Sequence, residues 1–334
     1  MATTASGDVQ IYQPQMQGAF IETIQQNVDA FNAASRGALR FEIRELKGQY
    51  EQEAFFDEVS SISRRDPSAD SSSSATATKL TQDEFVGVKL NRRNGPYEWN
   101  ISAARLAGFD PGRFSLAVGE QTAVATPQEM LDRALGALEA KLDAVSALSV
   151  DRFSSSPATL RTVDLANGLK NFGDKASRIV CWVMHSVPFF DLLIEQLGSS
   201  ASTVATLPWG MSLYEGTPVT LNRPVLVTDS ASLISYADES TGEPVYSTLG
   251  LTAGAAEIAL TEFPLAVAEG PITGADNLFI RWQAEYSYNL KLRGCAYNTG
   301  TGANPTDANV ANASNWTTKV ADNKLLPGVI IKTN

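Results

Sequence analysis

Cysteine and histidine are almost absent from this sequence of 334 residues. The two cysteines, Cys181 and Cys295, lie far apart and belong to no Cys-x-x-Cys motif, so we expect neither a disulfide framework nor a zinc site. Both are predicted to be buried as small apolar side chains. The sequence contains no Gly-x-Ser-x-Gly motif whose nucleophile the single histidine, His185, could activate, which argues against a serine or cysteine hydrolase. We therefore expect His185 to be structural, and we expect no catalytic residue, metal site or cofactor.

Long apolar runs and phosphate-binding motifs are also missing. Hydrophobic residues make up 43% of the chain, but no run of them approaches the roughly 20 residues that a membrane-spanning helix requires. Residues 1–8 have neither the basic nor the apolar part of a secretory signal. The one Gly-x-Gly, at 300–302, falls in an Asn/Pro-rich loop and not between a strand and a helix. The sequence therefore predicts no membrane contact and no nucleotide chemistry, in a protein made and kept in the cytoplasm.

Basic residues are fewer than acidic ones. The chain has 26 lysines and arginines against 37 aspartates and glutamates, a net charge of −11. Such a balance argues against a protein that holds nucleic acid tightly. Two explanations fit this charge equally well. One is an acidic surface that keeps the protein soluble, and the other is an acidic wall that does not bind an enclosed polyanion.

The N-terminal third combines a short helix with strands around a polar segment. Apolar residues at 20, 24, 28 and 31 lie on one face of a helix predicted over 17–34, after an uncharged, Pro-interrupted arm at 9–16. Two strands are predicted at 55–65 and 85–92, on either side of a Ser/Ala/Thr-rich run at 70–78. A two-stranded projection of this size is not stable alone in water, so it needs a neighbouring surface.

The middle of the chain contains the strongest helix signal. Thr126, Pro127 and Glu129 are typical of a helix start, and leucines at 131, 135, 138 and 142 followed by Val145 then form one apolar face. We predict a helix from Pro127 to Leu148, roughly 33 Å long. Further along, residues 178–186 are predicted to form a buried strand that leads into a helix, with Ser186 as its cap.

The rest of the chain is rich in strand signals. We predict strands at 217–229, within 250–268, at 279–290 and at the C-terminal end near 325–331, with Trp316 following a loop that contains Asn304-Pro305-Thr306. Taken in order, these elements resemble the major capsid proteins of tailed double-stranded DNA bacteriophages, which have the Hong Kong 97-type capsid fold. The strand before Met184-His185-Ser186 and the Leu325-to-Ile331 ending carry much of that resemblance.

The resemblance implies a mixed α/β (α+β) fold in five parts. These are an N-terminal arm, an extended β-hairpin loop (E-loop), a peripheral domain with a long spine helix at 127–148, an axial domain, and a return to the peripheral domain that ends in the C-terminal strand. Their predicted ranges are 1–43, 44–98, 99–160, 161–275 and 276–334.

The resemblance also implies a function. The chain would be a major capsid, or head, protein that self-assembles through hexamers and pentamers into an icosahedral head around phage DNA. Implied partners are copies of itself, a portal protein, a separate scaffolding protein, a decoration or cement protein, and packaged double-stranded DNA bound without sequence specificity. The protein would be located in the virion and assembled in the cytoplasm of the host bacterium. An encapsulin-type compartment shell is the alternative, and an α/β enzyme with an unrecognised site is a remote one.

Charged residues in the predicted hairpin are the candidate site. Complementary charges on neighbouring copies suit the orientation of subunits more than they suit catalysis. We therefore predict that these side chains make contacts between subunits. The acidic members are Glu51, Glu53, Asp57 and Glu58, and the basic members are Arg64, Arg65, Arg92 and Arg93. Some relatives join subunits by Lys–Asn bonds, but Lys79 and Lys89 match no motif for this.

Overall fold

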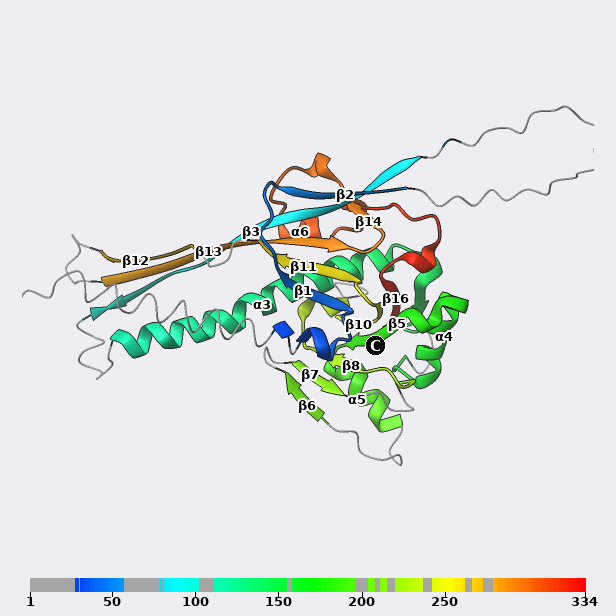
Figure 1. Cartoon of the computed structure of the whole chain (residues 1–334). Coiled ribbons are helices and arrows are strands. Elements are labelled where there is room, and N and C mark those ends of the chain that lie inside the picture. The colour runs from blue at the N-terminus through cyan, green and yellow to red at the C-terminus, as the bar shows by residue number, and fades with distance from the viewer. Residues whose placement is uncertain are drawn as a thin grey trace, which may run out of the picture.

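The computed structural model describes twelve stretches of the chain, and the structural statements below concern these alone. They are residues 28–29, 31–56, 79, 81–101, 111–154, 158–195, 204–207, 211–214, 220–236, 242–261, 266–272 and 279–334. Two β-sheets and one long helix dominate them (Figure 1). The expected mixed α+β class is therefore confirmed.

The first sheet has six strands in the order β1-β11-β13-β3-β2, and β12 pairs with β13 as well. β1 and β11 are parallel, whereas the pairs that involve β13 and the β2–β3 pair are antiparallel. The strands are β1 (Leu39–Ile43), β2 (Tyr50–Phe56), β3 (Gln82–Asn100), β11 (Ala256–Leu260), β12 (Ala266–Ile272) and β13 (Phe279–Leu292). Figure 1 shows β3, β12 and β13 extending together to one side of the molecule.

The second sheet has eight strands in the order β4-β16-β10-β5-β8-β7-β6, with β9 on β10. They are β4 (Ser149–Asp151), β5 (Ile179–Met184), β6 (Val204–Leu207), β7 (Met211–Tyr214), β8 (Val225–Val227), β9 (Ile234–Tyr236), β10 (Pro244–Thr252) and β16 (Gly328–Thr333). A separate two-stranded ladder joins β14 (Cys295–Tyr297) to β15 (Trp316–Thr318). β5 and β16 are buried along nearly their whole length, which accounts for the apolar runs Ile179–Met184 and Val329–Ile331.

The long helix α3 runs from Pro111 to Asp143, so the predicted spine helix at 127–148 is wrong at both ends. Pro127 lies inside the helix and Thr126 does not cap it. Residues 144–148 turn away into the short 3-10 helix η1 (Ser146–Leu148). With 33 residues, α3 is about 50 Å long. A proline inside a helix lacks an N–H and crowds the carbonyl four residues before it, and burial of the helix against its neighbours can offset that cost.

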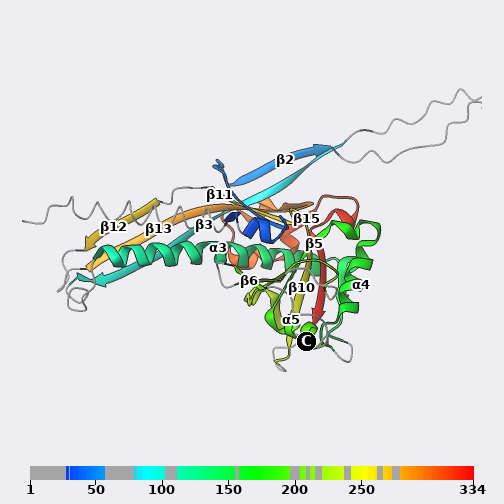
Figure 2. The same cartoon turned by 60° about the horizontal axis from the view of Figure 1, so that its bottom comes forward.

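The apolar face predicted for α3 is confirmed. Its leucines at 131, 135, 138 and 142 are all buried, and they belong to one continuous core shared with both sheets. Figures 1 and 2 show α3 running lengthwise beside β13 and β3 while its C-terminal half approaches β10 and β16. α3 is thus the element that the two sheets share.

Three further helices cover the second sheet and the C-terminal loops: α4 (Thr162–Phe172), α5 (Ser186–Glu195) and α6 (Asp307–Val310). The strand predicted at 178–186 and the helix after it are confirmed as β5 and α5. Ser186 is the first helical residue and not the cap. The His185 ring accepts a hydrogen bond from the Val187 N–H at 3.2 Å, and the Asp229 carboxylate accepts one from the Ser186 N–H at 3.3 Å.

Several other predictions are only partly within the described residues. The helix at 17–34 is seen from Val28 onward, and the arm at 9–16 lies outside the described residues. The strand predicted at 55–65 begins earlier, as β2, and is described only to Phe56. Residues 217–219 of the strand predicted at 217–229 lie outside the described residues, and the rest is reduced to β8, because Leu221 and Asn222 have φ angles of 55° and 58° and form a turn.

The predicted division into five domains remains a prediction, but the sheets combine distant parts of the chain. β1, in the predicted arm, pairs with β11, and β16 lies in the same sheet as β5, β8 and β10. Within the run 276–334, β13 belongs to the first sheet and β16 to the second.

The pairing of β10 with β16 depends on two glycines at neighbouring positions of the ladder. Leu251 is opposite Gly328 and Gly250 is opposite Val329. A Cβ on Gly250 would overlap the ring of Trp182, and a Cβ on Gly328 would overlap the Gly250 backbone carbonyl. Since backbone atoms cannot move aside as a flexible side chain can, the last strand requires glycine at position 328.

We expect Gly328→Ala to destabilise the folded subunit by about 3 kcal/mol or more, because the added methyl group separates β16 from β10. Urea unfolding followed by tryptophan fluorescence measures this. Gly300→Ala is the matched control, since its Cβ meets only the exposed Asn298 side chain. Equal stability of the two variants would contradict the close approach described here.

Polar contacts from α3 reach the second sheet as well. The Ser247 hydroxyl donates to the Glu139 carboxylate at 3.1 Å, and Lys332 pairs with Asp143 at 2.6 Å. Burial raises the pKa of Glu139, with neighbouring Asp143 adding to the shift and the Ser247 hydrogen bond and Lys332 opposing it. The folded subunit therefore binds a proton at Glu139 more readily than the unfolded chain does.

This difference predicts a pH dependence. As pH rises from about 4.5 through the raised pKa, ionised Glu139 lowers the free energy of unfolding, and the loss is complete above that pKa. We expect Glu139→Gln, which keeps a hydrogen-bonding side chain without the charge, to melt at a higher temperature than the wild type at pH 7. The difference should disappear near pH 4. A constant difference at both pH values in thermal unfolding would refute this.

Candidate functional site

The structure describes four of the eight predicted contact residues. Glu51 and Glu53 lie on β2, and Arg92 and Arg93 lie on β3, in the hairpin that the sequence predicted. Asp57, Glu58, Arg64 and Arg65 lie outside the described residues. Their proposed part in contacts between subunits therefore stays a prediction.

Arg92 is bound within its own subunit. Its guanidinium pairs with Glu129 of α3 at 3.0 Å and with Asp307 of α6 at 2.6 Å. Burial by itself lowers the pKa of Arg92, but Tyr288, Glu129 and Asp307 outweigh burial, so its pKa is raised. Arg92 thus connects the hairpin to the long helix, a role that the sequence did not indicate.

The partners of Arg92 form a polar cluster that also includes Arg133 and two tyrosines. The hydroxyls of Tyr286 and Tyr288, on β13, donate to the Glu129 carboxylate at 3.4 and 3.3 Å. Arg133 lies 3.3 Å from Asp307 and 3.6 Å from Glu129. Burial raises the pKa of Glu129, and Arg92, the Tyr288 hydrogen bond and Arg133 oppose that shift. The sequence did suggest Glu129, but as part of a helix cap.

The acidic residues of β2 also have partners within the subunit. Glu51 pairs with Arg44 at 2.6 Å and accepts a hydrogen bond from the Asn289 amide at 2.6 Å. Glu53 pairs with Lys291 of β13. Near the hairpin's other strand, Lys319 pairs with Asp83 at 2.8 Å. These contacts hold the base of the hairpin on its own sheet.

Arg93 differs from Arg92 although the two are adjacent. Its side chain is exposed, and no carboxylate among the described residues pairs with it. Alternate residues of a strand point to opposite faces, which explains why one arginine is covered and the next is free. Of the four described candidates, Arg93 is the one whose charge is available to another molecule.

An apolar surface that the sequence did not indicate lies on α5. Val187, Phe190, Leu193 and Ile194 are 38%, 54%, 37% and 63% exposed, and positions 187, 190 and 194 share one face of the helix. The Thr162 N–H donates to Glu195 at 3.2 Å, which brings the start of α4 next to the end of α5. Together these four residues form the α5 face, an apolar patch of the kind that marks an interaction surface.

Features that would carry chemistry are structural where they are described. Cys181 and Cys295 are buried and free, as predicted, and burial raises the pKa of Cys181 to about 12. His185 is buried, next to Asp229 and the start of α5. Across the described stretches, no three His, Cys, Asp or Glu side chains gather closely enough to hold a metal ion. No helix in them is long and apolar enough to cross a membrane.

Comparison with known proteins gives one family. A family model described as major capsid protein 13-like matches residues 8–330. No curated protein matches significantly.

Solved phage structures share the fold at low sequence identity. One from Mycobacterium phage Adephagia is 10% identical with a TM-score of 0.52, covering 89% of each chain. The capsid of Ralstonia phage GP4 is 8% identical with a TM-score of 0.52, covering 90% of this chain and 87% of that one. The capsid asymmetric unit of cyanophage Pam1 is 9% identical with a TM-score of 0.51, covering 76% and 84%.

Substitution of Arg92 and of Arg93 tests the ion pairs that the structure gives the one and not the other. We expect Arg92→Ala to destabilise the subunit by about 2 kcal/mol, because it leaves Glu129 half-buried without its closest cation. Arg93→Ala should change stability by less than about 0.5 kcal/mol. Chemical unfolding of the two variants measures both values. A large loss in Arg93→Ala, or none in Arg92→Ala, would mean that the described pairing is not the one in solution.

Proposed function

Because the chain belongs to the major capsid protein 13-like family, we propose that the α5 face is a contact through which its copies associate into a shell. The chain is a major capsid protein of phage type, and copies of it form the capsid of the virion. Assembly of a shell requires each subunit to present surfaces that others cover, and it requires no chemical reaction. The encapsulin alternative is not favoured, since the matching family is one of major capsid proteins.

The observation that carries the proposal is the exposure of the α5 face. A single apolar side chain that is exposed to water costs little free energy. A contiguous patch of four such side chains is stabilised when a partner covers it. The partner is a second copy of this chain, because self-association is what a subunit of this family does. Many modest contacts of this kind add up in a closed shell, where each copy is held by several neighbours.

Further partners are proposed on family membership. A head of this kind encloses double-stranded DNA, takes it in through a portal protein, and is built with a scaffolding protein made separately. A decoration or cement protein is a further candidate. The net charge of −11 supports a lining that does not hold DNA tightly, because an acidic wall repels phosphates. Arrangement into hexamers and pentamers follows from the same proposal.

Electron microscopy and light scattering of the purified chain test the function. We expect closed shells or ring-shaped capsomers from the chain alone, or together with its scaffolding protein. A stable monomer or dimer at every concentration, with and without that protein, would refute assembly as its role.

A second experiment isolates the α5 face. Phe190→Ser combined with Ile194→Ser should raise the protein concentration needed for half-maximal assembly at least about tenfold, because apolar contact area between copies is lost. Both side chains are largely exposed in the free subunit, so its melting temperature should stay close to that of the wild type. Normal assembly by this variant would show that α5 faces solvent in the shell.

A further inference from the structure

Four arginines lie on chain segments that meet near one turn, between β10 and β11. The turn covers residues 252–255, and its Gly254 N–H donates to the Gly37 carbonyl at 2.7 Å, which places Arg36 beside it. Thr252 is opposite Ile179, the residue that follows Arg178. The Arg293 N–H donates to the Ala255 carbonyl at 3.0 Å. Arg223 is fixed nearby, since its guanidinium donates to the Ile179 carbonyl at 2.8 Å. We call Arg36, Arg178, Arg223 and Arg293 the arginine cluster.

The hydrogen bonds recorded for these guanidinium groups go to backbone carbonyls. Arg223 also donates to the carbonyls of Leu221 and Ala176, both at 3.1 Å. Arg293 donates to the Ala253 carbonyl, and Arg178 to the Lys324 carbonyl at 3.4 Å. The ion pairs of the described residues involve other cations, and no described carboxylate pairs with a member of the cluster.

The positive charges in the cluster also repel one another. Burial lowers the pKa of Arg223 and Arg36 lowers it further, while burial and then Arg178 lower the pKa of Arg293. This arrangement is unexpected in a chain with 37 acidic and 26 basic residues, where carboxylates are abundant. An anionic group from outside the subunit would relieve the repulsion.

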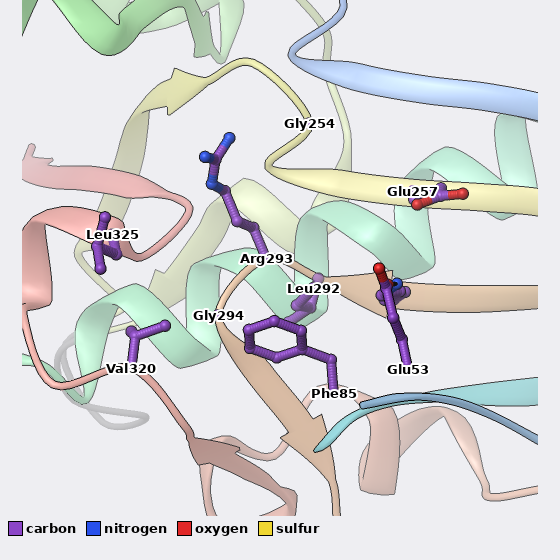
Figure 3. A pocket seen from close by; sticks show the side chains of 10 residues that line it. Glu53, Phe85, Gly254, Glu257, Leu292, Arg293, Gly294, Val320 and Leu325 are labelled. Carbon is purple, nitrogen blue, oxygen red and sulfur yellow. Dashed lines mark hydrogen bonds and ion pairs between the residues drawn. The ribbon is translucent and has the colours of Figure 1, made fainter. Parts of the chain in front are cut away.

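A pocket of about 330 Å³ opens at the same turn. Its apolar walls come from Phe85, Leu292, Val320 and Leu325, and its charged lining includes Glu257 and the ion pair of Glu53 with Lys291. Figure 3 shows the Arg293 side chain reaching toward the Gly254 turn, with Glu257 on the strand beyond it and Glu53 on β2. The pocket thus joins an apolar surface to charges of both signs.

This combination distinguishes between the two kinds of anion that a shell protein meets. A phosphodiester backbone has no apolar side chain to place in the pocket, so it would leave the apolar walls uncovered. A protein segment that carries a carboxylate beside an apolar side chain matches both parts, with its carboxylate at the arginines and its apolar group in the pocket.

We propose that the arginine cluster and the adjoining pocket bind a carboxylate-bearing segment of a second copy of this chain. The contact joins two different surfaces, so it is heterologous and can repeat around a ring of subunits. This inference rests on the proposed function, because it names a further surface through which the shell assembles. It uses a different part of the molecule from the α5 face.

The first experiment removes two charges that do little for the fold. Arg36→Asn suits the left-handed backbone at this exposed position, where φ is 51°, and Arg178→Gln gives up one long hydrogen bond. We expect the double variant to need at least about tenfold more protein for half-maximal assembly at low salt. Near 1 M NaCl, where the Debye length is about 3 Å, its difference from the wild type should shrink.

The matched control removes two exposed positive charges elsewhere, in Lys47→Gln combined with Lys170→Gln. If this control assembles as poorly as the arginine variant, the effect is one of net charge and the inference is wrong. Normal assembly of the arginine variant at low salt overturns the inference and leaves the proposed function standing. Failure of the wild type itself to assemble would overturn both.

A second experiment identifies the partner of the cluster. Arg178→Lys keeps the charge and introduces an amine, which a carbodiimide joins to a carboxylate in contact with it. Shells are assembled from equal amounts of ¹⁴N- and ¹⁵N-labelled subunits, free of DNA, and treated with the reagent. Mass spectrometry of the digest should find cross-links at position 178 that join one light and one heavy peptide.

The remaining outcomes each contradict the proposal. Cross-links only between peptides of the same label would mean that the carboxylate belongs to the same subunit. No cross-link in empty shells, together with arginine protection from phenylglyoxal only in DNA-filled particles, would assign the cluster to nucleic acid phosphates.

Discussion

The rest of the structure depends on how α3 is held between two sheets. Its leucine face contributes to a single core that both sheets share, so its burial links the two sheets. Its polar side chains also connect it to both sheets, at the edges of that core. Glu129 joins it to β3 and β13 through Arg92 and two tyrosines, and Glu139 joins it to β10 through Ser247. Because both carboxylates are largely removed from water, each is tolerated only with its partners in place.

A helix held in this way gives the hairpin a fixed base. Ion pairs from Glu53, Asp83 and Arg92 tie β2 and β3 to β13, to the C-terminal loop and to α6. A two-stranded projection would be unstable alone, and these contacts show how its described part is stabilised within one subunit. Of the four predicted contact charges that the structure describes, Glu51, Glu53 and Arg92 are therefore paired inside the subunit, whereas Arg93 is not.

In the proposed shell, three kinds of surface on different parts of the subunit would be available to neighbouring copies. The α5 face offers apolar area, Arg93 offers a single exposed charge, and the arginine cluster offers concentrated positive charge beside an apolar pocket. Apolar area supplies most of the free energy of association, whereas charge complementarity favours correct partners and orientations. A subunit with both can assemble by contacts that are individually weak and still specific.

The sequence by itself determined the α+β class, the strand that leads into α5, the leucine face of α3, the buried cysteines and the resemblance to phage capsid proteins. These follow from periodicity, from local propensity and from the order of elements along the chain. The tertiary structure alone decided that α3 passes through Pro127, that Arg92 faces inward and Arg93 outward, that Gly250 and Gly328 meet, and that four distant arginines share one turn. Periodicity shows which face of an element is buried but not what lies against it, and each of these features is a contact between residues far apart in the sequence.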